Sequence, residues 1–463
     1  MRKWSIALAA LLAGLATLLI VRPRLLRAQE NCNVAQGSGG TTQVFGQGTP
    51  SQATYMGGGV TVTCPESGRV IKADSMVMLA NGDQRLLIGH AYYSDKEKTL
   101  TADQINYMGA QKHMFAQFGG TNPMVQLVDK VNGAIIRGQY MDYTPAQGGK
   151  ESHAIIYSQS GRPHAVLRGK TQGGAPAPAA AAADTAHPDT TQARPARPAQ
   201  PDTSATLVDA DRMEITGQKA FHAIGNVVIT RSDMKGAAQD ALYDPDADHL
   251  KLSGSAKVTG DQFSLTGGTI DGNLVGNEFK DVTATFQAEL QSKDLRVKSP
   301  AMTIAFDKGQ VQRMVALSAE RAKRTATDGK VLAEAFAKDF HLVADSIDAK
   351  APGQKIEQVV AVGRAYGERQ NDSIKVKMPE IASKDWLRGD TITGYFTDAS
   401  PKARQEKGGK NAARNGNGKN AAPAPKVAGK PADGAGSSPA DSTERVLERI
   451  VAVGNDANAP ASS

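Results

Sequence analysis

The chain has 463 residues, among them 47 glycines, 22 prolines and only 23 aromatic residues, a composition that predicts some unpacked segments. Its net charge of +7 lies at the ends. Residues 1–28 carry five basic residues and no acidic one, and residues 401–443 carry eight basic and three acidic residues. The body is therefore slightly acidic, which argues against a nucleic-acid-binding surface. Two cysteines exclude a disulfide-dense scaffold and a cysteine-built zinc site.

The first 28 residues predict export from the cytoplasm. Arg2 and Lys3 precede an apolar run from Ile6 to Val21, followed by further arginines. This pattern is typical of a signal peptide or of a single hydrophobic helix that anchors the chain in the membrane. In the oxidising compartment beyond, Cys32 and Cys64 could form a disulfide. Residues 29–54 are expected to be flexible.

Two later segments contain almost no large apolar side chains. Residues 171–205 are rich in Pro and Ala, and residues 401–443 are rich in Lys, Gly, Asn and Ala. Neither can bury enough apolar surface to offset its chain entropy, so we expect two disordered linkers. They divide the chain into a first folded region at 55–170, a second at 206–400 and a C-terminal strand at 444–456.

The folded regions show a period of two. From His249 to Val258 the even positions are apolar or small and the odd positions are mostly polar. Similar short runs occur at Leu86–Tyr92, Ala223–Ile229, Leu295–Val297, Met302–Phe306 and Ile356–Tyr366. Many strands at short spacing predict an all-β sandwich, barrel or solenoid.

A short motif recurs in phase with these strands. The pattern Ala/Gly-Asp-x-Met/Ile occurs five times, with its aspartate at Asp74, Asp103, Asp211, Asp345 and Asp390. In three cases a strand containing Gly-x-Ala/Val follows, at Gly89, Gly225 and Gly363. Equivalent aspartates in every repeat indicate a structural role at the turn-like starts of strands, since a catalytic carboxylate is needed once.

After Asp390 the matching strand is delayed by the second linker. Residues 359–365 (VVAVGRA) and 450–456 (IVAVGND) are near copies. We expect Arg445–Gly454 to pair beside Gly389–Phe396. The other possibility is addition to the sheet of a neighbouring molecule.

The segments ADRMEI (210–215), AIGNVVIT (223–230), ALYDPDADHLKLSGSAKV (241–258) and LLIGHAYYSDKEKTLTADQINYM (86–108) resemble the OstA-like domain of the lipopolysaccharide-transport proteins LptA, LptC and LptD. The resemblance implies an open V-shaped β-jellyroll of stacked antiparallel strands, here in two repeat regions, whose interior holds acyl chains. It also implies end-to-end assembly. This sequence is longer than one such domain, and we expect in it no long C-terminal run of strands that would form a membrane barrel.

By that resemblance the protein would be a non-catalytic carrier of lipopolysaccharide through the periplasm. It would hold the lipid A moiety and work between an inner-membrane ABC transporter and an outer-membrane translocon, without nucleic acid. The groove would be lined by Leu86, Ile88, Val227, Ile229, Leu250, Leu252, Val258, Ile304, Phe306, Val360 and Val362. The main alternative is a secreted β-solenoid or adhesin-like protein with a filled core. A polysaccharide-acting enzyme on a β-helix is a third.

Enzyme motifs are absent from the sequence. There is no HExxH, no GxSxG and no GxGxxG after a strand, and Gly169-Lys170-Thr171 lacks the first glycine of a phosphate loop. The histidines are scattered, so we expect no catalytic residue, metal or cofactor. Trp386 could contact a lipid interface, and Lys384 and Arg388 could meet lipid phosphates.

Overall fold

The computed structural model describes residues 32–454 except 80–82, 121–123, 169–204, 219, 233, 276–277, 294, 324–331, 338–339, 371–383 and 399–444. The N-terminal apolar segment and nearly all of both predicted linkers lie outside these residues. Within them, no helix has the length and apolarity needed to cross a membrane. The chain forms two compact units that divide between Gly225 and Asn226, and each is described by itself.

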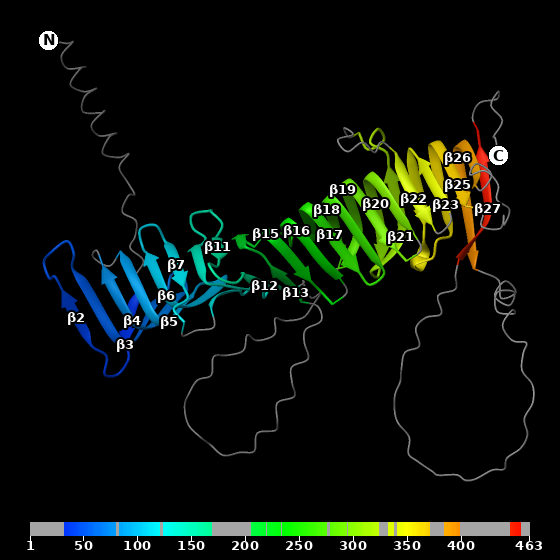
Figure 1. Cartoon of the computed structure of the whole chain (residues 1–463). Helices are drawn as coiled ribbons and strands as arrows, with labels where there is room; N and C mark the ends of the chain where they lie inside the picture. Colours follow the sequence, from blue (N-terminus) through cyan, green and yellow to red (C-terminus); the bar gives the residue numbers. More distant parts are fainter. Residues whose placement is uncertain are drawn as a thin grey trace, which may run out of the picture. The chain divides into compact units, whose positions relative to one another are not determined.

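Both units are built of antiparallel strands, which confirms the all-β prediction (Figure 1). Unit 1 contains β1 (Asn33–Gln36), β2 (Thr42–Phe45), β3 (Ala53–Cys64), β4 (Arg69–Leu79), β5 (Gln84–Ser94), β6 (Lys98–Met108), β7 (His113–Gln117), β8 (Val125–Asp129), β9 (Ile135–Gly138), β10 (Tyr140–Thr144), β11 (His153–Tyr157), β12 (His164–Leu167), β13 (Thr206–Asp209), β14 (Arg212–Thr216) and the start of β15 (Ala220–Thr230).

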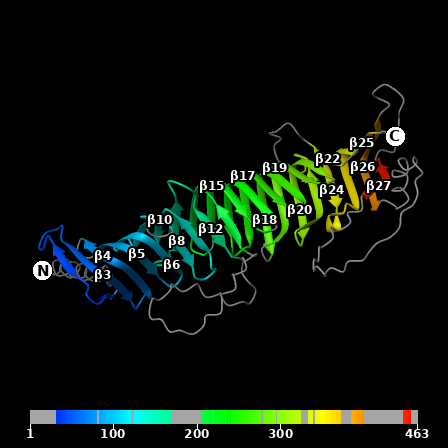
Figure 2. The same ribbon diagram turned by 60° about the horizontal axis from the view of Figure 1, so that its bottom comes forward.

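Unit 2 follows with β16 (Met234–Asp244), β17 (His249–Gly260), β18 (Phe263–Val275), β19 (Glu278–Ser292), β20 (Arg296–Asp307), β21 (Gln310–Leu317), β22 (Ala333–Ala337), β23 (Phe340–Ala344), β24 (Ser346–Lys350), the 3-10 helix η2 (Pro352–Gln354), β25 (Gln358–Gln370), β26 (Lys384–Asp398) and β27 (Arg445–Val453). Figure 2 shows β17 to β20 side by side.

Each long strand has a corner near its middle. The pairing register shifts there, and in alternate long strands two successive residues have positive φ, as at Gly89-His90, Gly254-Ser255 and Gly363-Arg364. Such two-residue bulges bend a strand sharply. We call the half of each long strand that continues from β2 arm A, and the half that continues from β1 arm B.

The aspartate of the repeated motif contacts the glycine at a corner. A Cβ atom on Gly225 would lie 2.6 Å from Asp211 Oδ2, and one on Gly363 would lie 2.5 Å from Asp345 Oδ2. The backbone N–H groups of Asp211 and Asp345 donate to the carbonyl oxygens of Gly225 and Gly363, at 3.0 and 2.8 Å. Glycine is required there for two reasons, the positive φ and the close carboxylate. Asp211 and Asp345 thus lie directly before β14 and β24, at strand starts as expected, whereas the other motif aspartates lie within β4, β6 and β26.

In unit 1 the sheet divides into two ladders at β6, the last long strand before a run of short strands. Arm A of β6 pairs with β7, and arm B pairs with β8. The A ladder continues as β7, β10, β11 and β14, and the B ladder continues as β8, β9, β12 and β13. The strands β13 and β14, which follow residues 169–204, are therefore hydrogen-bonded to strands that precede them. Unit 1 includes residues that the sequence analysis assigned to the second region.

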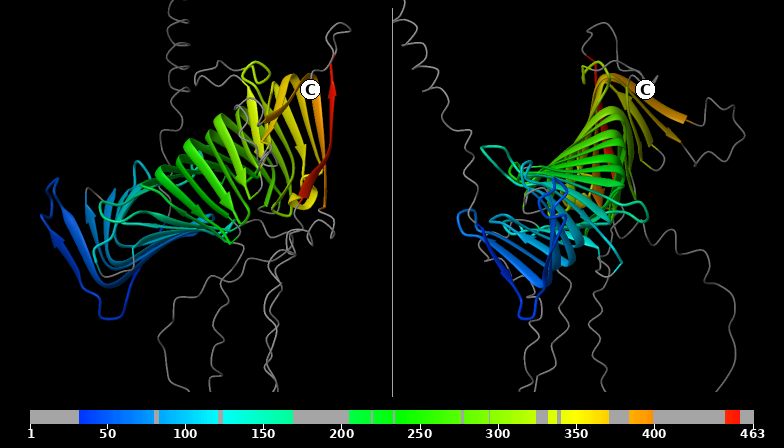
Figure 3. Two further views of the ribbon diagram at one scale, coloured as in Figure 1. Left: turned by 45° about the vertical axis from the view of Figure 1, so that its right-hand side comes forward. Right: turned by 90° about the vertical axis from the view of Figure 1, so that its left-hand side faces the viewer.

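Unit 2 repeats this arrangement with fewer strands. Arm A of β20 pairs with β21, and its arm B pairs with β22. The ladders β21–β24 and β22–β23 then rejoin on the single long strand β25. Next comes β26, and β27 pairs with arm A of β26 alone (Figure 3, red beside orange). This is the intramolecular pairing expected for the C-terminal strand.

Residues 33–36 and 42–45 differ from the flexible segment that was expected. They form β1 and β2 on the two arms of β3, and a disulfide joins Cys32 to Cys64. Their side chains are mostly exposed, with Val34, Val44 and Phe45 at 47–56% exposure. Backbone pairing with β3 thus orders residues whose side chains give no strong alternating signal.

Candidate functional site

Seven of the eleven predicted groove residues lie on the inner face of unit 2. Val227, Ile229, Leu250, Leu252, Val258, Ile304 and Phe306 are all buried, with exposures of 0–8%. Their strands have a clear inner and outer face: Leu252 is 1% exposed, whereas Val228 and Leu242 on the outer face are 39% and 43% exposed. In this part of unit 2 the inner side chains fill the space between the arms.

The other four residues lie on the outer face. Ile88 is 37% exposed and Leu86 is half-buried, whereas Leu87 between them is 2% exposed. Val360 and Val362 are likewise half-buried beside the buried Val359 and Ala361. The physical reason is that LLI and VVAV are apolar at every position, so alternation alone cannot choose a face. The inward residues of these strands are the neighbours of those predicted.

An apolar pocket opens near the C-terminal end of unit 2. Its volume is about 500 Å³, including space open to solvent, and fourteen apolar side chains and Gly394 line it. The floor is formed by buried side chains of β21 to β26, with Met314, Leu342, Ile347 and Ile392 each at most 2% exposed.

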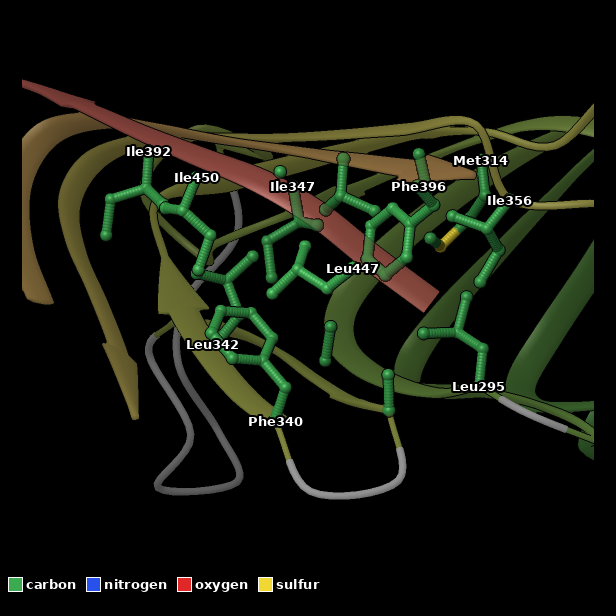
Figure 4. Close-up of a pocket in the computed structure, with 15 residues that line it drawn as sticks. Leu295, Met314, Phe340, Leu342, Ile347, Ile356, Ile392, Phe396, Leu447 and Ile450 are labelled. Carbon is green, nitrogen blue, oxygen red and sulfur yellow. The ribbon is translucent and has the colours of Figure 1, made fainter. Parts of the chain in front are cut away.

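The rim of the pocket comes from both arms. Leu295 and Phe340 lie at the arm B ends, and Ile356, Phe396 and Leu447 lie at the arm A ends. All five are half-buried. Figure 4 shows β27 running across the pocket, with Leu447 and Ile450 directed toward Leu342. The pocket is therefore an apolar gap between the free ends of the two arms. We call the place where the arm ends of a unit face each other the mouth of that unit.

Polar groups join the two arms at the mouth of unit 1. Lys98 at the start of arm B of β6 is 1% exposed, and its Nζ donates to Asp129 Oδ2 at 2.9 Å and to the carbonyl oxygen of Gly217 at 3.1 Å. Gly217 follows β14 in the A ladder. In addition, Arg69 Nη1 donates to the hydroxyl oxygen of Tyr107 on arm A at 3.1 Å.

Two tyrosines complete this closure of unit 1. The hydroxyls of Tyr93 and Tyr143 each donate to Asp95 Oδ2 at 3.1 Å, and their rings meet edge to face at 6.0 Å. Burial raises the pKa of both phenols above their usual value, and the charge of Asp95 raises it further. Both therefore remain neutral donors at physiological pH. Together with the Lys98 contacts they tie arm B to the A ladder.

In the first part of unit 2, aromatic side chains join the arms instead. Phe263 on arm B lies 5.3 Å from Phe306 on arm A, measured between ring centroids, and Phe279 lies 6.3 Å from Phe306. These contacts have no hydrogen bond to break. Beyond β20 the aromatic closure gives way to the pocket.

Histidines on the outer faces form cross-strand pairs with carboxylates. Nitrogen to oxygen distances are 2.8 Å for His90–Asp74, 3.1 Å for His113–Asp142, 2.9 Å for His164–Asp209 and 2.7 Å for His249–Asp271. Among the residues described, no group of three or more His, Cys, Asp or Glu could hold a metal ion. Trp386 is 45% exposed, and its contact with a lipid interface stays a prediction.

One segment of the chain is similar to a known protein family. Residues 203–277 match the family described as LptA/(LptD N-terminal domain) LPS transport protein. This confirms the OstA-like resemblance for β13 to β18, on a segment that begins in unit 1 and ends in unit 2. The segment is thus similar to lipopolysaccharide-transport proteins of that family.

A solved structure is also similar: LptH of Pseudomonas aeruginosa, described as the LptA homologous periplasmic component of the conserved lipopolysaccharide transport device. Identity is 16%, the match covers 33% of this chain and 92% of that one, and the TM-score is 0.23. No curated protein gives a significant match to this chain.

None of the eleven predicted residues lines the pocket. The lining side chains come from β21 to β27 and from the loops before β20 and β25, and several of them stand at strand ends. One signal in the sequence did point there: the delayed strand at 450–456 supplies Ile450. The position of the gap between two arms depends on contacts across the sheet, which a local pattern does not contain.

Proposed function

We propose that this protein is a non-catalytic carrier of lipopolysaccharide in the periplasm, and that unit 2 holds an acyl chain of lipid A in the apolar pocket between its arms. The pocket is the observation that carries the proposal. A hydrocarbon chain gains about 0.8 kcal/mol for each methylene removed from water. A rim of Leu295, Phe340, Ile356 and Phe396 offers such a chain an apolar surface with a solvent-facing opening.

The family match supports the same substrate. Residues 203–277 span the boundary between the two units. They end after β18, three strands before β21, the first strand that lines the pocket. On this proposal the sugar and phosphate groups of the lipid remain outside the mouth. Transfer along β16 to β20 requires the inner side chains, now 0–8% exposed, to move aside for the acyl chain.

The edge strands support assembly into a bridge. In unit 1, β1 and β2 expose Val34, Val44 and Phe45, and in unit 2, β27 exposes Val451 and Val453 at 38% and 53%. Open strand edges with apolar side chains favour strand addition. We place the protein between an inner-membrane ABC transporter and an outer-membrane translocon, in end-to-end contact with further copies or with related partners.

Photo-crosslinking in living cells tests the proposal. A photoreactive amino acid replaces Phe340 at the rim of the pocket, Ile304 on the packed inner face or Leu242 on the outer face. We expect lipopolysaccharide adducts at Phe340 and none at Leu242, which is 43% exposed. Adducts at Ile304 as well would show passage along unit 2. Adducts at none of the three, in a folded protein, would favour a filled-core structural protein.

A further inference from the structure

The last strand, β27, is one wall of the pocket and is also the least anchored strand of unit 2. Among the residues that the structure describes, it pairs with a single neighbour, and it covers only arm A of β26, residues 391–398. Every other long strand of unit 2 extends over both arms. A register shift between Tyr395 and Phe396 further interrupts this pairing. A strand held by one interrupted ladder is the first expected to open.

The side chains of β27 are divided between pocket and solvent. Leu447 and Ile450 face the pocket and are half-buried, whereas Val451 and Val453 are exposed. On the outer face, the guanidinium of Arg449 lies 4.6 Å from the ring centre of Tyr395. The apolar contacts that retain β27 are therefore with the same surface that an acyl chain would occupy, so strand and ligand compete for one set of partners.

The connection to β27 also favours reversible opening. Asp398 and Arg445 are separated by 46 residues whose sequence contains a single large apolar side chain, Val427. A long connection lowers the effective concentration of a tethered strand compared with a tight hairpin. By contrast, β20 and β21 are joined by two residues. The energetic advantage of intramolecular pairing is accordingly smaller for β27 than for the hairpin strands.

We propose that β27 is a removable wall: a single-chain apolar ligand enters the pocket sideways by displacing β27 from β26, so that ligand binding and β27 docking are competitive. This inference rests on the proposed function of the pocket and adds the route of entry. When β27 leaves, Ile392, Gly394 and Phe396 become accessible, and the N–H and C=O groups of arm A of β26 that bond to β27 lose their partners, whereas those bonded to β25 keep theirs. Opening the pocket thereby exposes a strand edge.

A cross-strand disulfide tests the wall directly. Thr393 and Val451 are register partners on the outer face, so the pair Thr393→Cys/Val451→Cys locks β27 when oxidised. The matched control is Thr283→Cys/Thr303→Cys, also register partners on the outer face, in β19 and β20 away from the pocket. The probe is dansylaminoundecanoic acid, a fluorescent fatty acid, added to the full chain.

We expect oxidation to slow probe association at least about tenfold in the β27 lock and to leave the control unchanged, because the lock removes the entry route. The variant Leu447→Ala/Ile450→Ala should accelerate association about tenfold, because it loosens the wall. In the unlocked protein, hydrogen exchange of the β27 amides should become faster when the probe binds.

The outcomes separate the two proposals. Equal association in the locked and unlocked protein, or β27 amides that stay protected while the probe is bound, overturns the removable wall and leaves the pocket as a binding site. Absence of binding to every form, including Leu447→Ala/Ile450→Ala, overturns the wall together with the proposed pocket function.

Discussion

The two units have the same strand plan but join their arms by different chemistry. Unit 1 uses a buried ion pair, Lys98 with Asp129, and tyrosines that share Asp95. Unit 2 uses phenylalanine contacts and then an apolar pocket. A buried charge that loses its partner is costly, whereas an apolar side chain can exchange one apolar neighbour for another. The same strand arrangement therefore has its arm ends joined by buried polar groups in unit 1 and separated by an apolar pocket in unit 2.

The largest expected effect is the loss of the polar latch of unit 1. Lys98→Met leaves the Asp129 carboxylate buried without its ammonium partner, and we expect unit 1 to lose about 3–5 kcal/mol of unfolding free energy. Chemical denaturation, with hydrogen exchange assigned to unit 1, measures it. The double variant Lys98→Met/Asp129→Asn should recover most of the loss, because the neutral amide needs no cation and its oxygen can still accept from the N–H groups of Val131 and Asn132. An unchanged unfolding free energy in Lys98→Met would show that the ion pair does not hold the arms of unit 1 together.

The aromatic closure of unit 2 should give the next largest effect. Phe306→Ala removes the ring that contacts both Phe263 and Phe279, and we expect a loss of about 3 kcal/mol, from burial and the cavity left behind. Thermal unfolding measures the change. The control Val275→Ala, at a side chain 62% exposed, should change stability by less than about 0.5 kcal/mol. An effect of Phe306→Ala as small as that of the control would contradict the closure.

The corner should be sensitive to one added methyl group. Gly363→Ala combines a φ of 77° with a Cβ atom 2.5 Å from Asp345 Oδ2, and we expect a cost of about 1–3 kcal/mol. The control Gly309→Ala has a similar φ of 71° and no atom within 4 Å of the added Cβ. Denaturation midpoints of the two variants separate backbone strain from the carboxylate contact. Equal midpoints would show that Asp345 does not restrict the position.

The smallest expected effect is a pH dependence on the outer face of unit 1. The hydrogen bond and the charge of Asp74 raise the pKa of His90 above 6.5. This contribution to stability is present below pH 6.5 and is lost as the pH rises through the higher pKa of the folded state. NMR titration of the His90 ring should give a midpoint above about 6.5, and Asp74→Asn should lower it. An unchanged midpoint in that variant would refute the pairing.

The corners were the most predictable part of the fold. The motif pair Asp-x-Met and Gly-x-Ala sets both the turn of the chain and the phase of the strand, because the residues two before and two after the glycine point inward. Leu87 and Ala91 flank Gly89 in this way, at 2% and 1% exposure. Counting from the glycine, and not from the apolar run, would have selected Leu87 and Ala361 in place of Ile88 and Val360.

The pocket and the latch could not be predicted from local patterns. Lys98 and Gly217 are 119 residues apart, and Leu295 and Leu447 are 152 residues apart in the chain. Whether such ends meet depends on how many short strands lie between two long ones. A lysine in a strand also normally indicates the solvent face. The burial of Lys98, which the carboxylate of Asp129 permits, could therefore not be predicted from the residues around it.

The division of a long strand into two ladders has a consequence for molecular reach. Between β6 and β15 the A ladder of unit 1 inserts four short strands, and between β20 and β25 unit 2 inserts two. At about 4.8 Å for each strand, the two extra strands lengthen the stack by roughly 10 Å. Duplicating or deleting one such pair would change the length of the stack by about 10 Å and leave the strands at either end unchanged.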